Sequence, residues 1–280
     1  MRPGAQRTVE DMVNYTTDIQ IFTVAFGVYI GAFASFLIRS AVRRTVFGWI
    51  GVAGLTTGAI TQLIAFGVRW HLAGHVPLSS MHEYASVMAW MAALLLALLL
   101  ARTRRFELGS LITPLVIAIM AMASLLPKEI HQQLIPALQS YWLHIHVSMA
   151  ALAEGAFAVS FGLAIYYLFK ERDPSTPPAE LARIDVLNHS AISVGYPLFT
   201  LGALFAGAIW AYEAWGSFWS WDPKEVGSWI IWLFYTGYLH ARYQRGWKGH
   251  KAAILSIIGF VMVILCFLGN LFLGGQHAYE

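Results

Sequence analysis

The chain has 280 residues, of which 58% are hydrophobic and 12% are charged, and its mean hydropathy is +0.60. Because soluble domains carry about 25% charged residues, this composition excludes a soluble globular protein. The single cysteine, Cys266, excludes a disulfide framework, a CxxC redox pair and a cysteine-based metal site, so we interpret it as a small apolar residue within the last apolar run.

Eight apolar runs each approach the roughly 20 residues that a helix needs to cross a bilayer. In chain order they lie at residues 19–38, 46–68, 84–101, 108–126, 142–168, 194–212, 226–243 and 252–275. Lipid cannot satisfy the backbone of an open strand, so the spanning segments must be helical. The sequence therefore predicts an all-α fold: a polytopic membrane bundle of about eight transmembrane helices that forms a single domain over residues 1–280.

The basic residues indicate the orientation of this bundle. Thirteen of the 18 Lys and Arg residues fall after the first, third, fifth and seventh runs. The positive-inside rule places these connections in the cytoplasm and both termini on the extracytoplasmic side. The same bias accounts for the pI of about 9.0, so we expect no nucleic-acid partner. The segment before the first run lacks the basic start of a cleaved signal peptide, and we expect that helix to be retained.

Two connections carry further patterns. On the inner side, residues 170–190 form a polar linker whose Pro-rich start indicates a loop. After Pro178, apolar residues at helical spacing predict a short helix on the membrane surface. On the outer side, residues 128–142 predict a second interfacial helix, interrupted at Pro136.

The seventh run is preceded by a helix start signal. Asp222 suits the N-cap position, Pro223 suits the first helical position, and Glu225 follows the cap by three residues. This order is typical of a capping box, so we expect the two acids to stabilise the helix start.

The outer loop before this helix, within residues 210–232, is rich in tryptophan. Trp215, Trp219 and Trp221 fall within seven residues, in the stretch WGSFWSWDPKE at 215–225. One tryptophan at this place is typical of the aromatic belt at the headgroup level. Three of them, with a further tryptophan just before the loop and two just after it, favour stacking against a flat aromatic ligand.

Three histidines are candidate ligands because of their depth. His146 lies about one turn into the fifth run from its outer end, and His277 follows the eighth run on the same side. His240 lies roughly 20 Å below the outer surface at 1.5 Å per residue, a depth at which an ionisable residue is a functional candidate. Imidazole is a preferred axial ligand of haem iron. Two outer histidines beside a tryptophan-rich loop therefore favour a haem site.

Five stretches in the same order resemble the CcsA (also ResC) family, the haem-handling membrane proteins of cytochrome c maturation. The stretch WGSFWSWDPKE resembles the WWD motif of the family, and RWHLAGHVPLSSMHEYASVMAW at 69–90 resembles its RW…GH-x-PLSN-x-YES segment. Three further stretches match those that carry the family's histidines: YWLHIHV at 141–147, WLFYTGYLHAR at 232–242 and GGQHAYE at 274–280. Ser80 and His82 depart from the family's usual Asn and Tyr.

The resemblance implies a haem-handling subunit of the system II cytochrome c synthase. Such a subunit carries haem b, held non-covalently as the transported substrate, across the bacterial cytoplasmic or thylakoid membrane. His240 would bind the iron within the membrane, and His146 and His277 would be the ligands and catalytic residues outside. The tryptophan loop would hold the haem ring, through Trp215, Gly216, Trp219, Trp221, Asp222 and Pro223.

The resemblance also implies two protein partners. A CcsB (ResB) membrane subunit would supply the second histidine of the embedded site, and apocytochromes with a CxxCH motif would receive the haem through thioether bonds. The haem propionates would meet Lys224, Arg69 or Lys128, among which the sequence does not choose.

Three other functions compete with this one. The chain would be a transporter of haem, or of another amphipathic molecule, if it joined its cargo to nothing. It would be a lipid-linked glycan enzyme if external carboxylates were placed for acid–base chemistry. A transmembrane b-type cytochrome is disfavoured, because neither His146 nor His240 has a histidine 13 or 14 residues further on, and Pro136 separates His131 from His144.

Overall fold

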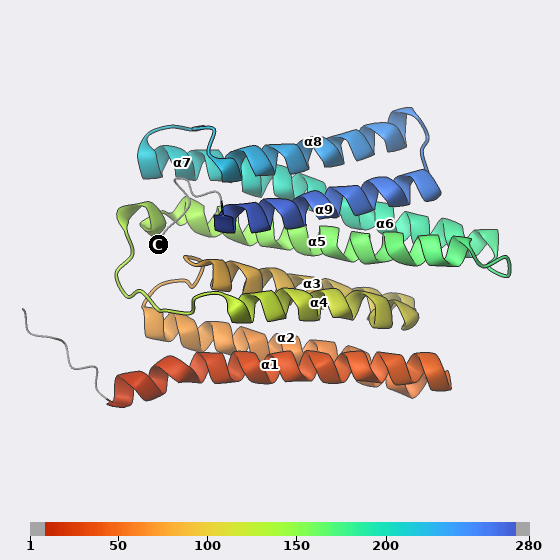
Figure 1. The fold of residues 1–280 in the computed structure, drawn as a ribbon, viewed down its shortest axis with the longest axis horizontal. Coiled ribbons are helices and arrows are strands. Elements are labelled where there is room, and N and C mark those ends of the chain that lie inside the picture. Colours follow the sequence, from red (N-terminus) through yellow and green to blue (C-terminus); the bar gives the residue numbers. More distant parts are fainter. Residues whose placement is uncertain (1–8, 273–280) are drawn as a thin grey trace, which may run out of the picture.

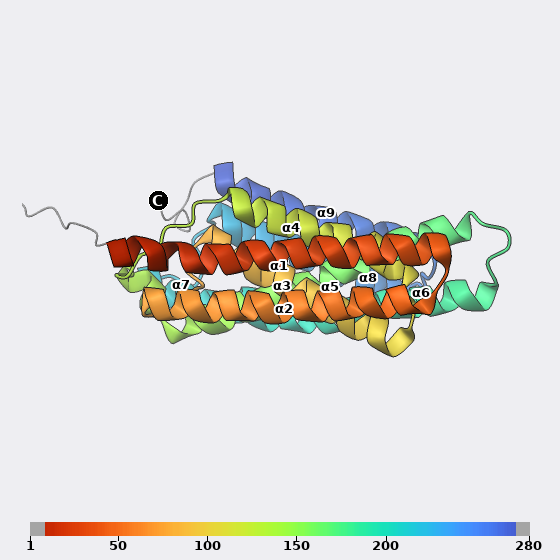
Figure 2. The same ribbon diagram turned by 90° about the horizontal axis from the view of Figure 1, so that it is seen from below.

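A computed structural model of the chain describes the backbone of residues 9–272 and the side chains of residues 17–269. Residues 9–272 consist of helices and connecting loops with no strand, which confirms the predicted all-α class. The helices lie side by side along one long axis (Figure 1), and the view turned by 90° shows the same elongated bundle (Figure 2). This is the architecture that a bilayer imposes on a polytopic chain.

Neighbouring helices in the sequence pack as pairs, α1 with α2, α3 with α4, α5 with α6 and α8 with α9. The most extensively buried helix, α5, contacts α3, α4, α6 and α9 and so joins the two halves of the bundle. The helical segments are α1 (Val9–Val42), α2 (Thr45–Ala73), α3 (Met81–Thr103), α4 (Glu107–Leu125), η1 (Pro136–Gln139), α5 (Tyr141–Glu171), α6 (Pro178–Phe199), η2 (Thr200–Ala206), α7 (Gly207–Trp215), α8 (Pro223–Gln244) and α9 (His250–Phe272).

Among the described residues, 7 helices are long and apolar enough to cross a membrane, with α6, η2 and α7 counted as one helix from Pro178 to Trp215. The eighth predicted span, residues 226–243, is α8, which has 22 residues but falls short of the same hydropathy. Its Trp and Tyr residues, with His240 and Arg242, lower the mean hydropathy. Even so, α8 runs beside α9 along the bundle (Figure 1), in the place expected of a transmembrane helix.

Two predicted surface helices have a different structure. Only residues 172–177 of the predicted linker 170–190 are loop, and the part after Pro178 is the first turns of α6 itself. Its buried polar residues have partners inside the bundle: Asp185 pairs with Arg242, and Asn188 accepts from the Ser160 hydroxyl. On the other side, residues 128–140 form an extended loop with one 3₁₀ turn, η1, which Pro136 begins, and residues 141–142 already belong to α5.

The connections between helices lie at two ends of the bundle, and the basic residues gather at one of them. The loops at 43–44, 104–106, 172–177 and 245–249 lie at one end of the bundle (Figure 1), and they are flanked by the basic residues that the sequence predicts for the inner side. The loops at 74–80, 126–140 and 216–222 lie at the opposite end, where α1 begins and α9 ends. We call these the basic end and the loop end.

A buried ionic cluster fixes three helices at the loop end. The Arg69 guanidinium donates to Asp18 at 2.8 Å and to Glu83 at 2.6 Å, and the three side chains are at most 5% exposed. It also donates to the backbone carbonyls of Lys128 and Glu129, both at 3.1 Å. The cluster thus ties α1, α2 and α3 to the loop at 126–135.

Replacing this guanidinium should destabilise the protein strongly. In Arg69→Met, two carboxylates would remain buried without their counter-charge, a loss that costs about 3–5 kcal/mol. Denaturation in mixed micelles would measure the free energy of unfolding. The matched control is Arg105→Met, because Arg105 pairs with Glu180 at 3.4 Å with both side chains partly exposed, and such pairs contribute about 1 kcal/mol or less. If both variants lost the same free energy of unfolding, burial of the ion pair would not explain its contribution to stability.

Candidate functional site

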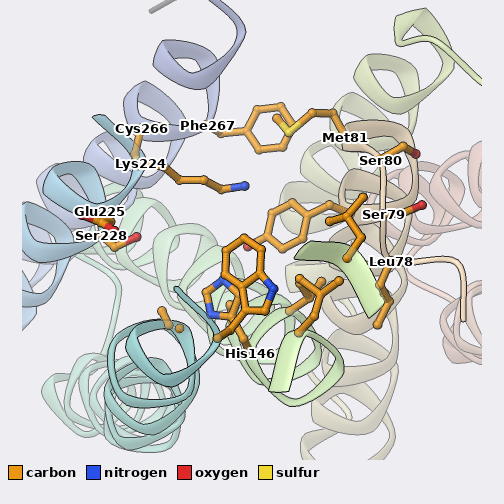
Figure 3. A pocket seen from close by; sticks show the side chains of 18 of the residues that line it. Leu78, Ser79, Ser80, Met81, His146, Lys224, Glu225, Ser228, Cys266 and Phe267 are labelled. Carbon is orange, nitrogen blue, oxygen red and sulfur yellow. The ribbon is translucent and has the colours of Figure 1, made fainter. Parts of the chain in front are cut away.

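A cavity of about 870 Å³ opens between the two halves of the bundle near the loop end. This volume falls in the range of about 300–1,000 Å³ that small-molecule and cofactor sites occupy. Figure 3 shows side chains of α3, α5, α8 and α9 directed into it. Its walls are mainly apolar, with a few polar groups that converge on the same space, and include Leu78, Leu143, His146, Val147, Trp219 and Phe267.

His146 is one of the residues that line this cavity (Figure 3). Its Nδ1 atom lies 3.0 Å from the backbone carbonyl oxygen of Gly202. Since a carbonyl only accepts, Nδ1 carries the proton, and the Nε2 lone pair is left to bind a metal. Trp210 stacks parallel to the imidazole, with the ring centroids 5.8 Å apart at 7°, and holds the plane of the ring.

A π-helical segment, η2, presents the carbonyl that orients His146. The N–H of Gly207 bonds to Gly202 O, five residues earlier, which is the spacing of a π-helix. Glycine permits the close approach of this segment to α5, since a Cβ at Gly202 would lie 2.3 Å from Cβ of Met149. Trp232 secures the start of η2 by donating to the Thr200 hydroxyl at 3.0 Å.

Adding one methyl group at Gly207 should disturb the imidazole without touching the ligand atom. A Cβ there would lie 2.9 Å from Nδ1 of His146 and 3.0 Å from its Cε1, so the ring must move away from Gly202 O. Loss of an outer hydrogen bond to a ligating histidine costs about 10–100-fold in metal affinity. We expect a weakening of that size for haem in Gly207→Ala, measured by absorbance titration.

The control for this prediction is Gly67→Ala. Gly67 also lies within a helix, and a Cβ there meets nothing within 4 Å. Unchanged haem affinity in Gly207→Ala, with the control also unchanged, would show that the orientation of the His146 ring is unimportant.

The predicted tryptophans do not all face the cavity. Trp219 lines it, whereas Trp215 packs edge-on against Trp210 at 4.9 Å in a second apolar cluster with Leu78. Trp221 is 69% exposed and adopts a positive φ of 61°. Trp210, which lies outside the predicted set, lines the cavity, is buried and donates from Nε1 to Ala137 O at 2.7 Å. Trp210 and Trp219 are therefore the indoles placed to hold a ligand in the cavity.

The predicted cap of α8 is confirmed. The Asp222 side chain accepts from the N–H of Lys224 at 2.9 Å, and Glu225 accepts from the N–H of Asp222 at 3.2 Å and of Ser220 at 2.7 Å. Pro223 occupies the first turn of the helix. Gly216 ends α7 with φ 79°, in the left-handed region that favours glycine. These residues shape the loop, and they direct Lys224 and Trp219 to the cavity.

Of the other two predicted histidines, His240 lies within the described residues and His277 does not. His240 lies on the exposed surface of α8, roughly 26 Å along the helix from Pro223 at 1.5 Å per residue. It is not among the residues that line the cavity around His146. His144 also lies outside the lining, although it is two residues from His146. His277 falls outside the described residues, so its place beside His146 stays a prediction.

The cavity also holds polar groups that the predicted site did not include. Glu154 and Tyr84 line it, and the Tyr84 hydroxyl donates to the Glu154 carboxylate at 2.6 Å. Lys224 extends into the cavity (Figure 3). Its Nζ atom lies 5.9 Å from the centre of the Tyr84 ring. Glu154 had a signal in the sequence, because it is an acid near the middle of an otherwise apolar run.

The segment at 69–90 builds one wall of the cavity. Glu83 completes a capping box with Ser80 at the start of α3, in addition to its ion pair with Arg69. His75 bonds to His131 O at 2.8 Å, and His82 bonds to Ala123 O at 2.7 Å. Both histidines thus hold the backbone around the loop at 126–135, and neither lines the cavity.

Comparison with known proteins finds relatives over nearly the whole chain. The sequence profile of the family described as "Cytochrome C assembly protein" matches residues 78–277. The cytochrome c biogenesis protein CcsA of Guillardia theta is 33% identical over 96% of this chain and 97% of its own length. CcsA of Chlamydomonas reinhardtii is 40% identical over 76% of this chain and 63% of its own length. CcsA of Synechococcus elongatus is 35% identical over 82% and 87% respectively.

A solved structure shares the fold. The cytochrome c haem lyase CcmF superposes with a TM-score of 0.68 over 98% of this chain, at 14% sequence identity. This chain spans 51% of the length of that protein. At such low identity the likeness concerns the arrangement of the helices, and it supports the membrane bundle described above.

Proposed function

This chain belongs to the CcsA family of cytochrome c biogenesis proteins, and on that premise we propose that it carries haem across a membrane and presents it for thioether attachment to CxxCH apocytochromes. The family gives the chain a role in cytochrome c maturation as an integral membrane protein. The observation that carries the finer proposal is His146, whose Nδ1 is bonded to Gly202 O and whose ring lies in an aromatic-lined cavity.

In this proposal the cavity is the outer haem site. His146 binds the iron through Nε2, and His277 completes the coordination from the opposite face. The indoles of Trp210 and Trp219 and the apolar wall hold the ring and exclude water. Two imidazole ligands leave the iron no open position, while the apolar walls fix the vinyl groups against the arriving thiols. Each thiol adds across one vinyl group, forming a C–S bond while the thiol proton passes to the other vinyl carbon.

His240 would bind haem at an earlier stage. It lies near the basic end of α8 and faces outward from the bundle, where a second membrane subunit can approach. A partner of the CcsB type would supply the other axial histidine. The positive-inside rule makes the basic end cytoplasmic, so the haem would move from His240 to the extracytoplasmic cavity at the loop end.

The glycan enzyme that the sequence left open is disfavoured by its carboxylates. Asp222 and Glu225 are engaged in the cap of α8, and Glu83 is paired with Arg69. Glu213 accepts a hydrogen bond from the Ser140 hydroxyl. These four external acids therefore have structural partners.

A reporter assay tests the proposal. The chain is co-expressed with a CcsB-type subunit and a secreted reporter that carries one CxxCH motif, and covalent haem on the reporter is measured after denaturation. We expect covalent haem with the motif, and none when both reporter cysteines are replaced by serine. A purified complex that binds haem but never labels the reporter would favour a haem transporter without ligation. A complex that never binds haem would contradict both functions.

A further inference from the structure

The lining of the outer cavity contains one group suited to binding an anion, the ammonium of Lys224. Lys224 reaches into it from the first turn of α8, and its Nζ atom lies over the Tyr84 ring (Figure 3). Among the described residues, Lys224 has no carboxylate within the 4.0 Å of an ion pair. A cation that is held in a largely apolar cavity without a salt bridge is available to an anionic ligand.

The other two cations considered for this role are already engaged elsewhere. Arg69 is buried between Asp18 and Glu83, outside the cavity lining. Lys128 also lies outside the lining and donates to the Ser124 carbonyl at the end of α4. The cavity lining therefore contains Lys224 alone of the three.

Apart from Lys224, the described cavity lining offers hydroxyl, amide and imidazole groups but no second lysine or arginine; these groups belong to Ser79, Ser80, Ser228, Gln133 and His131. The walls near His146 are formed by residues such as Leu78, Leu143 and Val147, which suit the ring of a porphyrin and not its acids. The Tyr84 hydroxyl already donates to Glu154. Glu154 itself is an acid, so it repels a carboxylate, and Lys224 is the only lysine or arginine among the described residues that line the cavity.

We propose that Lys224 binds a haem propionate in this cavity and thereby fixes the in-plane orientation of the ring, a proposal that rests on the haem-presenting function above. With the propionates held at Lys224, the opposite, vinyl-bearing part of the ring is turned away from the lysine and offered to the apocytochrome. Lys224 is a positioning residue, because it contacts the substrate at a distance from the reacting carbons. Glu154 opposes it, and the balance of the two sets the preference for an acid.

The experiment compares haem with haem dimethyl ester, which keeps the ring, the vinyl groups and the iron but lacks the negative charges. Both are titrated by Soret absorbance into the detergent-purified complex with its CcsB-type partner, in a His240→Gly background that leaves the outer cavity as the site measured. A hydrogen bond to a charged group is worth about tenfold or more in affinity. We expect the complex to bind haem about tenfold more tightly than the ester.

The variants separate this role from a general loss of structure. Lys224→Met should weaken haem binding to the level of the ester and leave ester binding unchanged, while Lys224→Arg should keep the preference. Glu154→Gln removes a like charge and should increase the preference for haem, an effect opposite in sign to that of Lys224→Met. Lys128→Met is the matched control and should change neither titration.

The outcomes separate a failure of the proposed role of Lys224 from a failure of the proposed haem-presenting function. Equal affinity for haem and its ester in the unsubstituted cavity would overturn the role of Lys224 and leave the proposed function standing. Equal weakening of both ligands in Lys224→Met would overturn it as well, because it would show a structural effect. If neither ligand shifts the Soret band while His146 is intact, the proposed function fails and the orientation fails with it.

Discussion

Replacing His146 by glycine should remove the bis-histidine spectrum of the outer haem site and abolish attachment of haem to the CxxCH reporter. The reason is that His146 would donate an axial ligand from Nε2, with its ring fixed by Gly202 O and by the parallel indole of Trp210. Since loss of an outer hydrogen bond alone costs about 10–100-fold in metal affinity, loss of the ligand should cost at least about 100-fold. Haem titration in a His240→Gly background measures this directly.

Two controls make this prediction specific. Added imidazole should enter the space left by the side chain and restore part of the spectrum and of the reporter labelling. His144→Gly is the matched variant, because His144 lies two residues before His146 on the same turn of α5 but outside the cavity lining. We expect it to bind and attach haem normally. Loss of haem in His144→Gly with retention in His146→Gly would reverse the assignment of the ligand.

The parts of the fold that the bilayer imposes could be predicted from the sequence. The bilayer requires long apolar helices, so the runs at 19–38 and 252–275 predict α1 and α9. The cap of α8 could be predicted because it depends on Asp222, Pro223 and Glu225 alone, all within one turn. Local chemistry of this kind is independent of what packs nearby.

Other features depend on contacts between distant residues. The polar start of α6 has the pattern of a surface helix, but Asp185 pairs with Arg242, 57 residues away, and so has a partner within the bundle. The π-helical segment η2 has no sequence signature, yet it provides the carbonyl that orients His146. Likewise, a high local density of tryptophan does not reveal which indoles face inward, and Trp210 lines the cavity where Trp221 does not.

Glu154 is an ionisable residue deep within an apolar run, as His240 is. The same argument from depth that singles out His240 applies to an acid within residues 142–168. Placed beside Tyr84 and Lys224, it gives the cavity both signs of charge. In the proposals above, the histidines would determine where the iron binds, whereas Lys224 and Glu154 would determine how the ring around it is turned.

The second large effect is expected at the basic end, where Asp185→Ala should reduce the free energy of unfolding by about 3–5 kcal/mol. The Asp185 carboxylate accepts from both terminal nitrogens of Arg242, at 2.7 and 2.8 Å, and from the N–H of Gly249 at 2.8 Å. It thereby joins α6, α8 and the start of α9. Without it, the guanidinium would be buried unpaired, since its side chain is only 7% exposed.

Replacing both partners separates the ion pair from the packing around it. In Asp185→Leu with Arg242→Met no charge is left buried, so the double variant should recover more than half of the stability that Asp185→Ala loses. Denaturation in mixed micelles would measure both. Because His240 lies two residues before Arg242 on α8, we also expect Asp185→Ala to weaken haem bound at His240 while leaving the outer cavity competent. A double variant less stable than the single one would show that the pair contributes net stability of its own, beyond avoiding an unpaired charge.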